Sequence, residues 1–339
     1  TPGDMDFLLH VMKPDIWIIT KLDSVHSDNF PGGVGQLWQD KFKLLLASRE
    51  STYFNYSDSF SKQHEELLTN NSYIFHKNVK NVKLSHEENQ LKQSFVYEKK
   101  NISINLIWDE SIEYTKLSLD IAQKVGIKLW EKNYDFKFIE QEWRFSLFER
   151  NGNILIDSSY NAGPESMKQV IFNTQKFAWT VSPDYKIIYV LWDMREIGDV
   201  KKQAHINLWE LLTDAHGVYT IWPEMYQYLI PKLREDNFSG MIHSSLSARE
   251  IWKDLKKYLS DNWEKKFIIL FKWSQNTIFT EEALALHLTP TQRKSIPRQT
   301  EDWKHKKDIF FGLMMSNFII IAIALLVKFE EIRTKKTLF

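Results

Sequence analysis

The feature that most restricts the fold of this chain is a regular alternation of apolar runs and helical patterns after residue 143. Strand-like runs lie at 144–149, 154–156, 186–191, 218–221 and 266–271, and helical patterns lie between them at 165–176, 201–213, from 224 and at 247–260. Strands that alternate with helices in this way form a mostly parallel sheet covered on both faces. The sequence therefore predicts an α/β fold.

The run IDSSYNAGPESM, residues 156–167, stands at one of these crossovers. It follows an apolar strand-like stretch, turns through Asn161, Gly163 and Pro164, and enters a helical pattern at Glu165. Polar side chains at a strand-to-helix crossover line the crevice in which α/β sheets bind ligands. We therefore expect a ligand site at this run.

Length, charge and cysteine content narrow the class of protein. A chain of 339 residues can form two domains with full cores. Lys+Arg and Asp+Glu both number 44, so the overall charge gives no attraction to nucleic acid. The absence of cysteine excludes disulfides, zinc thiolates and thiol nucleophiles, and it indicates a reducing cytoplasm.

The first half has a less regular pattern. Helices are expected near 2–12, 34–48 and 111–125, with a buried strand at 16–22. Residues 52–107 are largely polar, with short strand-like pieces around 73–75 and 94–97. A domain boundary is expected near 132–143.

A stretch without charge lies near the end of the chain. Residues 309–327 are 19 in number and would span about 28 Å as a helix, close to the ~30 Å of a bilayer core. Basic residues flank it on both sides, so its orientation stays open. The stretch predicts a transmembrane helix, and the alternative is a buried terminal helix.

The run at 156–167 resembles the segment D-D-S-Y-N-A-N-P-x-S-M of the Mur ligase family, in the members that add D-Ala-D-Ala to the peptidoglycan precursor. Four further segments resemble the same family in the same order: TPGDMDFLLHVMKPDIWIITKLDSVHSDNF (1–30), Trp143-Arg144, YVLWDMREIG (189–198) with His205 downstream, and FKWSQNT (271–277). A short motif alone has a high false-positive rate. The shared order of five segments argues against chance.

The resemblance implies a fold, a reaction and a location. The fold would be part of a Mur-ligase-like central ATPase domain in 1–140 and a Rossmann-like C-terminal domain in 143–307, followed by the transmembrane helix. The reaction would be ATP-dependent addition of D-Ala-D-Ala to UDP-N-acetylmuramoyl-tripeptide, through an acyl phosphate and with Mg²⁺ at the phosphates. The location would be the cytoplasm, with possible tethering to its membrane through 309–327.

The resemblance also assigns residues on the metal side of the site. His26 matches a family histidine that helps to hold magnesium, and its alternative is a surface loop histidine. Lys41 matches the family's carbamylated catalytic lysine, with Lys43 as a competitor and a solvated helix lysine as the alternative.

A second group of residues matches the side of the site that closes over the ligands. Arg144, Asp157 and Tyr160 match nucleotide-binding positions, and Asn161 and Ser166 match substrate-binding positions. An arginine there can make planar, bidentate contacts with phosphate. The alternatives are an arginine exposed on a strand edge and an aspartate that caps a turn.

One departure from the family limits the expected activity. A phosphate-binding loop of the G-T-N-G-K-T type occurs nowhere in the sequence, although backbone amides and a lysine in such a loop hold the phosphates of ATP. We therefore expect the polypeptide as given to be inactive by itself. Two alternatives stay open: another ATP-dependent amide ligase of the cyanophycin or folylpolyglutamate synthase type, and a non-catalytic, membrane-tethered remnant.

Tryptophan stands at several positions where the related sequences favour glycine: Trp17, Trp143, Trp192, Trp222 and Trp273. The chain has 11 glycines and 13 tryptophans, which together make up about 7% of it, the usual share of glycine alone. Indoles at sites that need a positive φ or a close approach would strain the fold. One hypothesis is that UGA codons for glycine are read here as tryptophan; the alternative is genuine tryptophan in a diverged enzyme.

Overall fold

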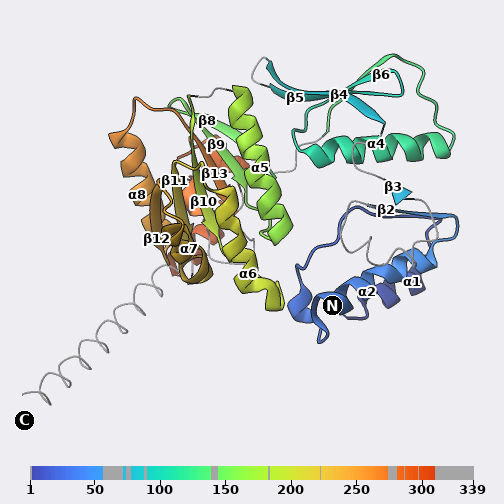
Figure 1. Cartoon of the computed structure of the whole chain (residues 1–339), viewed down its shortest axis with the longest axis horizontal. Helices are drawn as coiled ribbons and strands as arrows, with labels where there is room; N and C mark the ends of the chain where they lie inside the picture. Colours follow the sequence, from blue (N-terminus) through green and yellow to red (C-terminus); the bar gives the residue numbers. More distant parts are fainter. Residues whose placement is uncertain are drawn as a thin grey trace, which may run out of the picture.

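The computed structural model describes residues 2–55, 72–73, 78–87, 90–138, 144–181, 184–221, 223–273, 281–285, 287–296 and 298–309. Its strands form three sheets, two within residues 16–136 and one within residues 146–272 (Figure 1). The third sheet and its helices form the unit on the left of Figure 1, and the first two sheets form the part on the right.

The six-stranded sheet has the order β12-β11-β10-β13-β9-β8. Its strands are β8 (Ser146–Arg150), β9 (Asn153–Ser158), β10 (Lys186–Trp192), β11 (Gly217–Ile221), β12 (Met241–Ser245) and β13 (Phe267–Lys272). The five strands from β9 to β13 are parallel, whereas β8 pairs antiparallel with β9 across a tight turn at Asn151 and Gly152. Both turn residues have positive φ, which asparagine and glycine tolerate. The predicted mostly parallel sheet is confirmed.

Helices cover both faces of this sheet because its central strands are apolar on both sides. Within β10, Tyr189 and Leu191 pack on one face, and Ile188, Val190 and Trp192 pack on the other. The first face is covered by α5 (Pro164–Val181), α7 (Ile230–Glu235) and the 3₁₀ turn at Asn207–Leu211, next to α6 (Lys201–Ile206). The second is covered by α8 (Ala248–Asp261) and α9 (Glu281–Ala285).

Two smaller sheets make up the first half of the chain. One is parallel and contains β1 (Ile16–Ile19), β2 (Ser51–Asn55) and β3 (Ser72–Tyr73), next to α1 (Asp4–Val11) and α2 (Gly33–Ala47). The other is mixed and contains β4 (Val79–Glu87), β5 (Gln90–Tyr97), β6 (Lys100–Ile104) and β7 (Asn133–Phe136). Helix α4 (Asp109–Lys124) packs Ile112 on the mixed sheet and Leu117 against Tyr53 of the parallel sheet. It joins the two sheets into one body (Figure 1).

Strand β7 of the mixed sheet lies inside the predicted boundary at 132–143, and the six-stranded sheet begins after it, at Ser146. The assignment of 1–140 and 143–307 to two Mur ligase domains stays a prediction. The helix expected at 201–213 is shorter than expected, since α6 ends at Ile206 and a 3₁₀ turn follows.

Three of the five tryptophans that replace expected glycines lie among the described residues. Trp17, Trp192 and Trp273 all lie outside the left-handed region of φ. Trp192 and Trp273 are each 1% exposed and pack in the apolar core beneath α8. The prediction that these three sites need a positive φ is therefore wrong. Trp143 and Trp222 lie outside the described residues.

No helix among the described residues is long and apolar enough to cross a membrane. The predicted transmembrane stretch 309–327 lies, apart from Ile309, outside the described residues, so it stays a prediction from the sequence.

Candidate active site

A cleft opens where the carboxyl ends of β9 and β13 face the loop that follows β1. It has two chambers of about 750 and 390 Å³. The larger is lined by residues of α2 and α6 and is called here the α2–α6 chamber; the smaller contains Arg144 and is called the Arg144 chamber. The carboxyl ends of parallel strands are where α/β sheets bind ligands. The run at 156–167 therefore lies at the cleft, as the sequence predicted.

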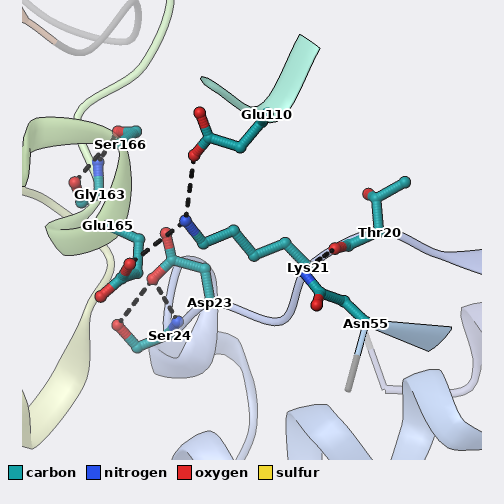
Figure 2. Close-up of polar contacts among 9 residues, drawn as sticks. All are labelled: Thr20, Lys21, Asp23, Ser24, Asn55, Glu110, Gly163, Glu165 and Ser166. Atoms are coloured by element: carbon teal, nitrogen blue, oxygen red, sulfur yellow. Dashed lines mark hydrogen bonds and ion pairs between the residues drawn. The ribbon is translucent and has the colours of Figure 1, made fainter. Parts of the chain in front are cut away.

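Lys21 stands between the two chambers and lines both of them. Its ammonium nitrogen lies 3.2 Å from Oε2 of Glu165 at the start of α5 and 3.8 Å from Oε1 of Glu110 at the start of α4. Figure 2 shows the lysine extended between these two carboxylates. Three elements that are distant in the sequence thus meet at one side chain.

The loop after β1 also approaches the crossover before α5 very closely. A β-carbon placed on Gly163 would lie 2.4 Å from Cγ2 of Val25 and 2.8 Å from Oδ2 of Asp23. Burial raises the pKa of the Asp23 carboxyl, and the negative charge of Glu165 raises it further. The hydrogen bond from the backbone N–H of Ser24 and the positive charge of Lys21 lower this pKa. Because both atoms would lie closer than van der Waals contact allows, a larger residue at position 163 would have to displace Val25 and Asp23.

Arg144, Tyr160 and Lys272 form one wall of the Arg144 chamber. The guanidinium carbon of Arg144 lies 4.0 Å from the centre of the Tyr160 ring, which is a cation–π contact. Lys272 ends β13 and is 4% exposed. Burial lowers the pKa of its ammonium to about 7, and the positive charge of Arg144 acts in the same direction. Arg144 therefore gives this wall its permanent positive charge, and Lys272 adds a second charge only below about pH 7.

Asp157 lies beneath this wall and lines neither chamber. Its Oδ1 accepts a hydrogen bond of 3.1 Å from the backbone N–H of Ser159, which is the turn-capping alternative raised by the sequence. Burial raises the pKa of its carboxyl to about 7, against the hydrogen bonds from Ser159.

Asn161 and Ser166 both line the Arg144 chamber. Oδ1 of Asn161 accepts a hydrogen bond of 2.8 Å from the backbone N–H of Ala162. The hydroxyl of Ser166 accepts a hydrogen bond of 3.0 Å from the N–H of Gly163 and closes the first turn of α5 (Figure 2). The structure thus brings Arg144, Tyr160, Asn161 and Ser166 together.

His26 and Lys41 lie outside the linings of both chambers. Nδ1 of His26 is 2.5 Å from Oε2 of Glu196, which follows β10. Within the described residues, no group of three or more His, Asp or Glu side chains is placed to hold a metal ion. His26 and Glu196 therefore do not form a magnesium site by themselves.

Lys41 lies on α2 on the side of Asp23. Burial lowers the pKa of its amine, and the negative charge of Asp23 partly offsets that effect. Lys43 instead makes ion pairs of 2.6 Å with Asp6 and 2.8 Å with Asp40. Of the two candidate lysines, only Lys41 has an amine whose pKa is lowered by burial.

The segment YVLWDMREIG contains residues whose hydrogen bonds hold the backbone that follows β10. The two carboxylate oxygens of Asp193 accept hydrogen bonds of 3.0 and 2.8 Å from the backbone N–H groups of Glu224 and Met225. Nε2 of buried His205 accepts one of 3.0 Å from the N–H of Met194, and its Nδ1 lies 2.7 Å from the carbonyl oxygen of Lys201. These side chains hold the backbone after β10 in place.

The sequence did not single out Lys21, Glu110, Glu165 or Lys272. Lys21, Glu165 and Lys272 occur within segments that resemble the family, which was the available signal, whereas Glu110 lies outside those segments. Their mutual contacts depend on the packing of separate elements.

The chain has the fold of the Mur ligases. It aligns with the MurF ligase from Thermotoga maritima in complex with ADP at a TM-score of 0.65 and 20% identity, over 85% of this chain and 64% of that one. It aligns with MurF from Acinetobacter baumannii at a TM-score of 0.66 and 16% identity, over 84% of this chain and 61% of that one.

The sequence is similar to the UDP-N-acetylmuramoyl-tripeptide–D-alanyl-D-alanine ligase of Borreliella burgdorferi, at 24% identity over 222 residues. The match covers 61% of this chain and 45% of that protein, so the chain spans about half the length of this relative. No protein-family model matches the chain. The expected resemblance to the D-alanyl-D-alanine-adding Mur ligases is confirmed.

Proposed function

We propose that the residues lining the two chambers of the cleft form part of the active site of an ATP-dependent ligase that adds D-Ala-D-Ala to UDP-N-acetylmuramoyl-tripeptide. The observation that supports this most directly is the cleft. In it, Arg144, Asn161 and Ser166 from one half of the chain face Lys21 and Asp23 from the other. The similarity to a relative named for this reaction supports the choice of substrates.

The reaction requires two ligands to meet in one protected space. A carboxylate takes a phosphoryl group from ATP, and the amine of the dipeptide then attacks the acyl carbon, forms the amide and releases phosphate. In our proposal Arg144, held against Tyr160, contacts the phosphates, since its planar fork matches phosphate oxygens. Asn161 and Ser166 contact the substrate. Asp157 lies beneath the wall that contains Arg144 and Tyr160, and it supports the nucleotide-binding residues of that wall.

Lys41 fits the proposed carbamylated lysine in one respect. Carbamylation requires a neutral amine, and burial of Lys41 shifts its pKa in that direction. Magnesium would have to take most of its ligands from phosphate oxygens and water, as this ion commonly does. His26 stays a proposed contributor to it.

The test uses the full chain together with a second polypeptide that supplies a Mur ligase phosphate-binding loop and precursor-binding domain. We expect phosphate release only from the mixture, and only when ATP, UDP-N-acetylmuramoyl-tripeptide and D-Ala-D-Ala are all present. Arg144→Ala should reduce the rate about 100-fold or more, as loss of a preorganised contact to developing charge does. Arg249→Ala is the matched control, because Arg249 pairs with Asp308 on the surface.

Two results would overturn the proposal. Activity with glutamate in place of D-Ala-D-Ala would favour a folylpolyglutamate-type ligase. A mixture that binds nucleotide but never releases phosphate would favour the non-catalytic remnant. The predicted membrane helix at 309–327 is a separate proposal, tested by whether its deletion releases the protein from membranes.

A further inference from the structure

Lys272 is a buried lysine whose amine has no hydrogen-bond or ion-pair partner in the described part of the chain. It is 4% exposed, and its amine forms no hydrogen bond or ion pair with any described residue. Burial of an ammonium without compensation is strongly unfavourable, so such groups are rare unless they meet a ligand. The side chain lines the Arg144 chamber, so a ligand in that chamber can reach it.

Both signs of charge surround Lys272. The positive charge of Arg144 and the negative charges of Asp157 and Asp23 act on its amine, and the chamber is also lined by Lys21, Glu110 and Glu165. Asp157 is one strand away, because Lys272 pairs with Ser158 across β13 and β9. Oδ1 of Asp157 accepts a hydrogen bond from the N–H of Ser159, and the negative charge of Glu281 also acts on the Asp157 carboxyl. None of these carboxylates forms an ion pair with Lys272.

A helix N-terminus lies beside the same chamber. Helix α5 has 18 residues and begins at Pro164, and its residues Glu165, Ser166 and Gln169 line the chamber. The first N–H groups of a helix have no partner within it, and the helix dipole favours negative charge there. The lysine, the arginine and the helix end come from three separate elements.

We propose that Lys272, together with Arg144 and the N-terminus of α5, anchors one oxyanion of a ligand in the Arg144 chamber. The oxyanion is a carboxylate or a phosphate, because both accept hydrogen bonds from an ammonium, a guanidinium and backbone amides. In the proposed reaction it is either the terminal carboxylate of the dipeptide or a phosphate of the nucleotide. The anchor needs only an oxyanion, so it does not depend on the proposed reaction.

Proton uptake should accompany binding. Burial lowers the pKa of Lys272 to about 7, so above neutral pH the amine must gain a proton to hold the anion. Affinity should fall about tenfold for each pH unit above that value, since one proton is linked to binding.

The experiment is calorimetric titration of the full chain at pH 8 with three probes: ADP, D-alanyl-D-alanine and inorganic phosphate. Two buffers of different ionisation enthalpy give the number of protons taken up. Lys272→Met should weaken at least one probe tenfold or more and abolish its proton uptake. Loss of ADP and inorganic phosphate identifies a phosphate anchor, and loss of the dipeptide alone identifies a carboxylate anchor.

Lys116→Met is the matched control, because Lys116 is also 4% exposed but pairs with Asp120 at 2.9 Å on α4. We expect Lys272→Met to keep or raise the melting temperature while binding is lost. Lys116→Met should lower the melting temperature and keep binding. Unchanged affinity and proton uptake in Lys272→Met would overturn the anchor.

Two additions keep the test decisive. Lys272→Gln serves as a second variant if the methionine protein does not fold, and it should show the same loss of proton uptake. If neither ADP nor the dipeptide binds the parent protein, the proposed function is in doubt. Inorganic phosphate that binds the parent protein but not Lys272→Met would then still show a phosphate anchor, and failure of all three probes to bind the parent would overturn the anchor.

Discussion

Nζ of Lys21 lies 3.2 Å from Oε2 of Glu165, across the cleft between the two halves of the chain. The lysine follows β1, and the glutamate opens α5 on the six-stranded sheet. Glu110 of α4 is the second carboxylate near the same nitrogen. This contact separates the two chambers and ties three elements together.

We expect the Lys21–Glu165 ion pair to contribute little to the free energy of unfolding, although it lies at the centre of the cleft. Both side chains are partly exposed, at 29% and 45%, and exposed ion pairs contribute about 0.2–1 kcal/mol. A double-mutant cycle with Lys21→Met and Glu165→Gln should give a coupling of about 0.5 kcal/mol in urea unfolding, and less in 1 M salt. A coupling that does not change with salt would show that the pair is not electrostatic.

His205 should make the protein sensitive to acid. Burial lowers its pKa from the ordinary 6.5, so the unfolded state binds the proton more readily than the folded state. The stability it contributes is complete above about pH 6.5 and is lost as the pH falls through the lower folded pKa. His205→Gln should flatten the loss of unfolding free energy below pH 6.5. His10→Gln, at an exposed site on α1, should leave that slope unchanged.

Glu281 should be essential for the stability of the C-terminal part of the described chain. The residue is fully buried, with Lys307 at 3.0 Å and Arg298 at 2.7 Å from its two oxygens. Glu281→Gln removes the negative charge that pairs with Arg298 and Lys307, and it should lower the unfolding free energy by about 3–5 kcal/mol. Glu301→Gln, which removes an exposed pair with Lys304, should cost less than about 1 kcal/mol. Chemical denaturation of both variants measures the difference.

Trp192 gives a test of the recoding hypothesis. Its indole is buried in the core beneath α8, so Trp192→Gly should leave a cavity and lower the unfolding free energy by about 4 kcal/mol or more. Trp130→Gly, at a site 81% exposed, should have little effect. A Trp192→Gly protein as stable as its parent, or a UGA codon at position 192, would support glycine as the native residue. A UGG codon there would end the hypothesis.

The second half of the fold was predictable because its strands are apolar on both faces. Runs such as 186–191 and 266–271 are too apolar for an exposed sheet and too short for most helices. The mixed sheet of the first half was largely missed. Its strand β6 buries only Ile102 and Ile104 and alternates them with polar residues over five positions, which is too short a pattern to separate from a loop.

The sequence predicted which segments contribute to the candidate site, but it did not predict which side chains of different segments meet there. The crossover at 156–167 could be placed at a crevice because strand ends and helix starts meet there. The closeness of Lys21 to Glu110 and Glu165 depends on how α4 and α5 pack, and the hydrophobic pattern of the sequence does not predict that packing. Lys272 occurs in a recognisable segment, but its burial without an ion-pair partner among the described residues is a property of the folded wall.

Gly163 has a consequence for how the two halves fit together. Because a single methyl group there would overlap Val25 and Asp23, main chain from one half bears directly against side chains of the other at this point. A side chain added at this position would push the loop after β1 away from the start of α5, so the size of residue 163 sets how closely the two halves meet at this end of the cleft.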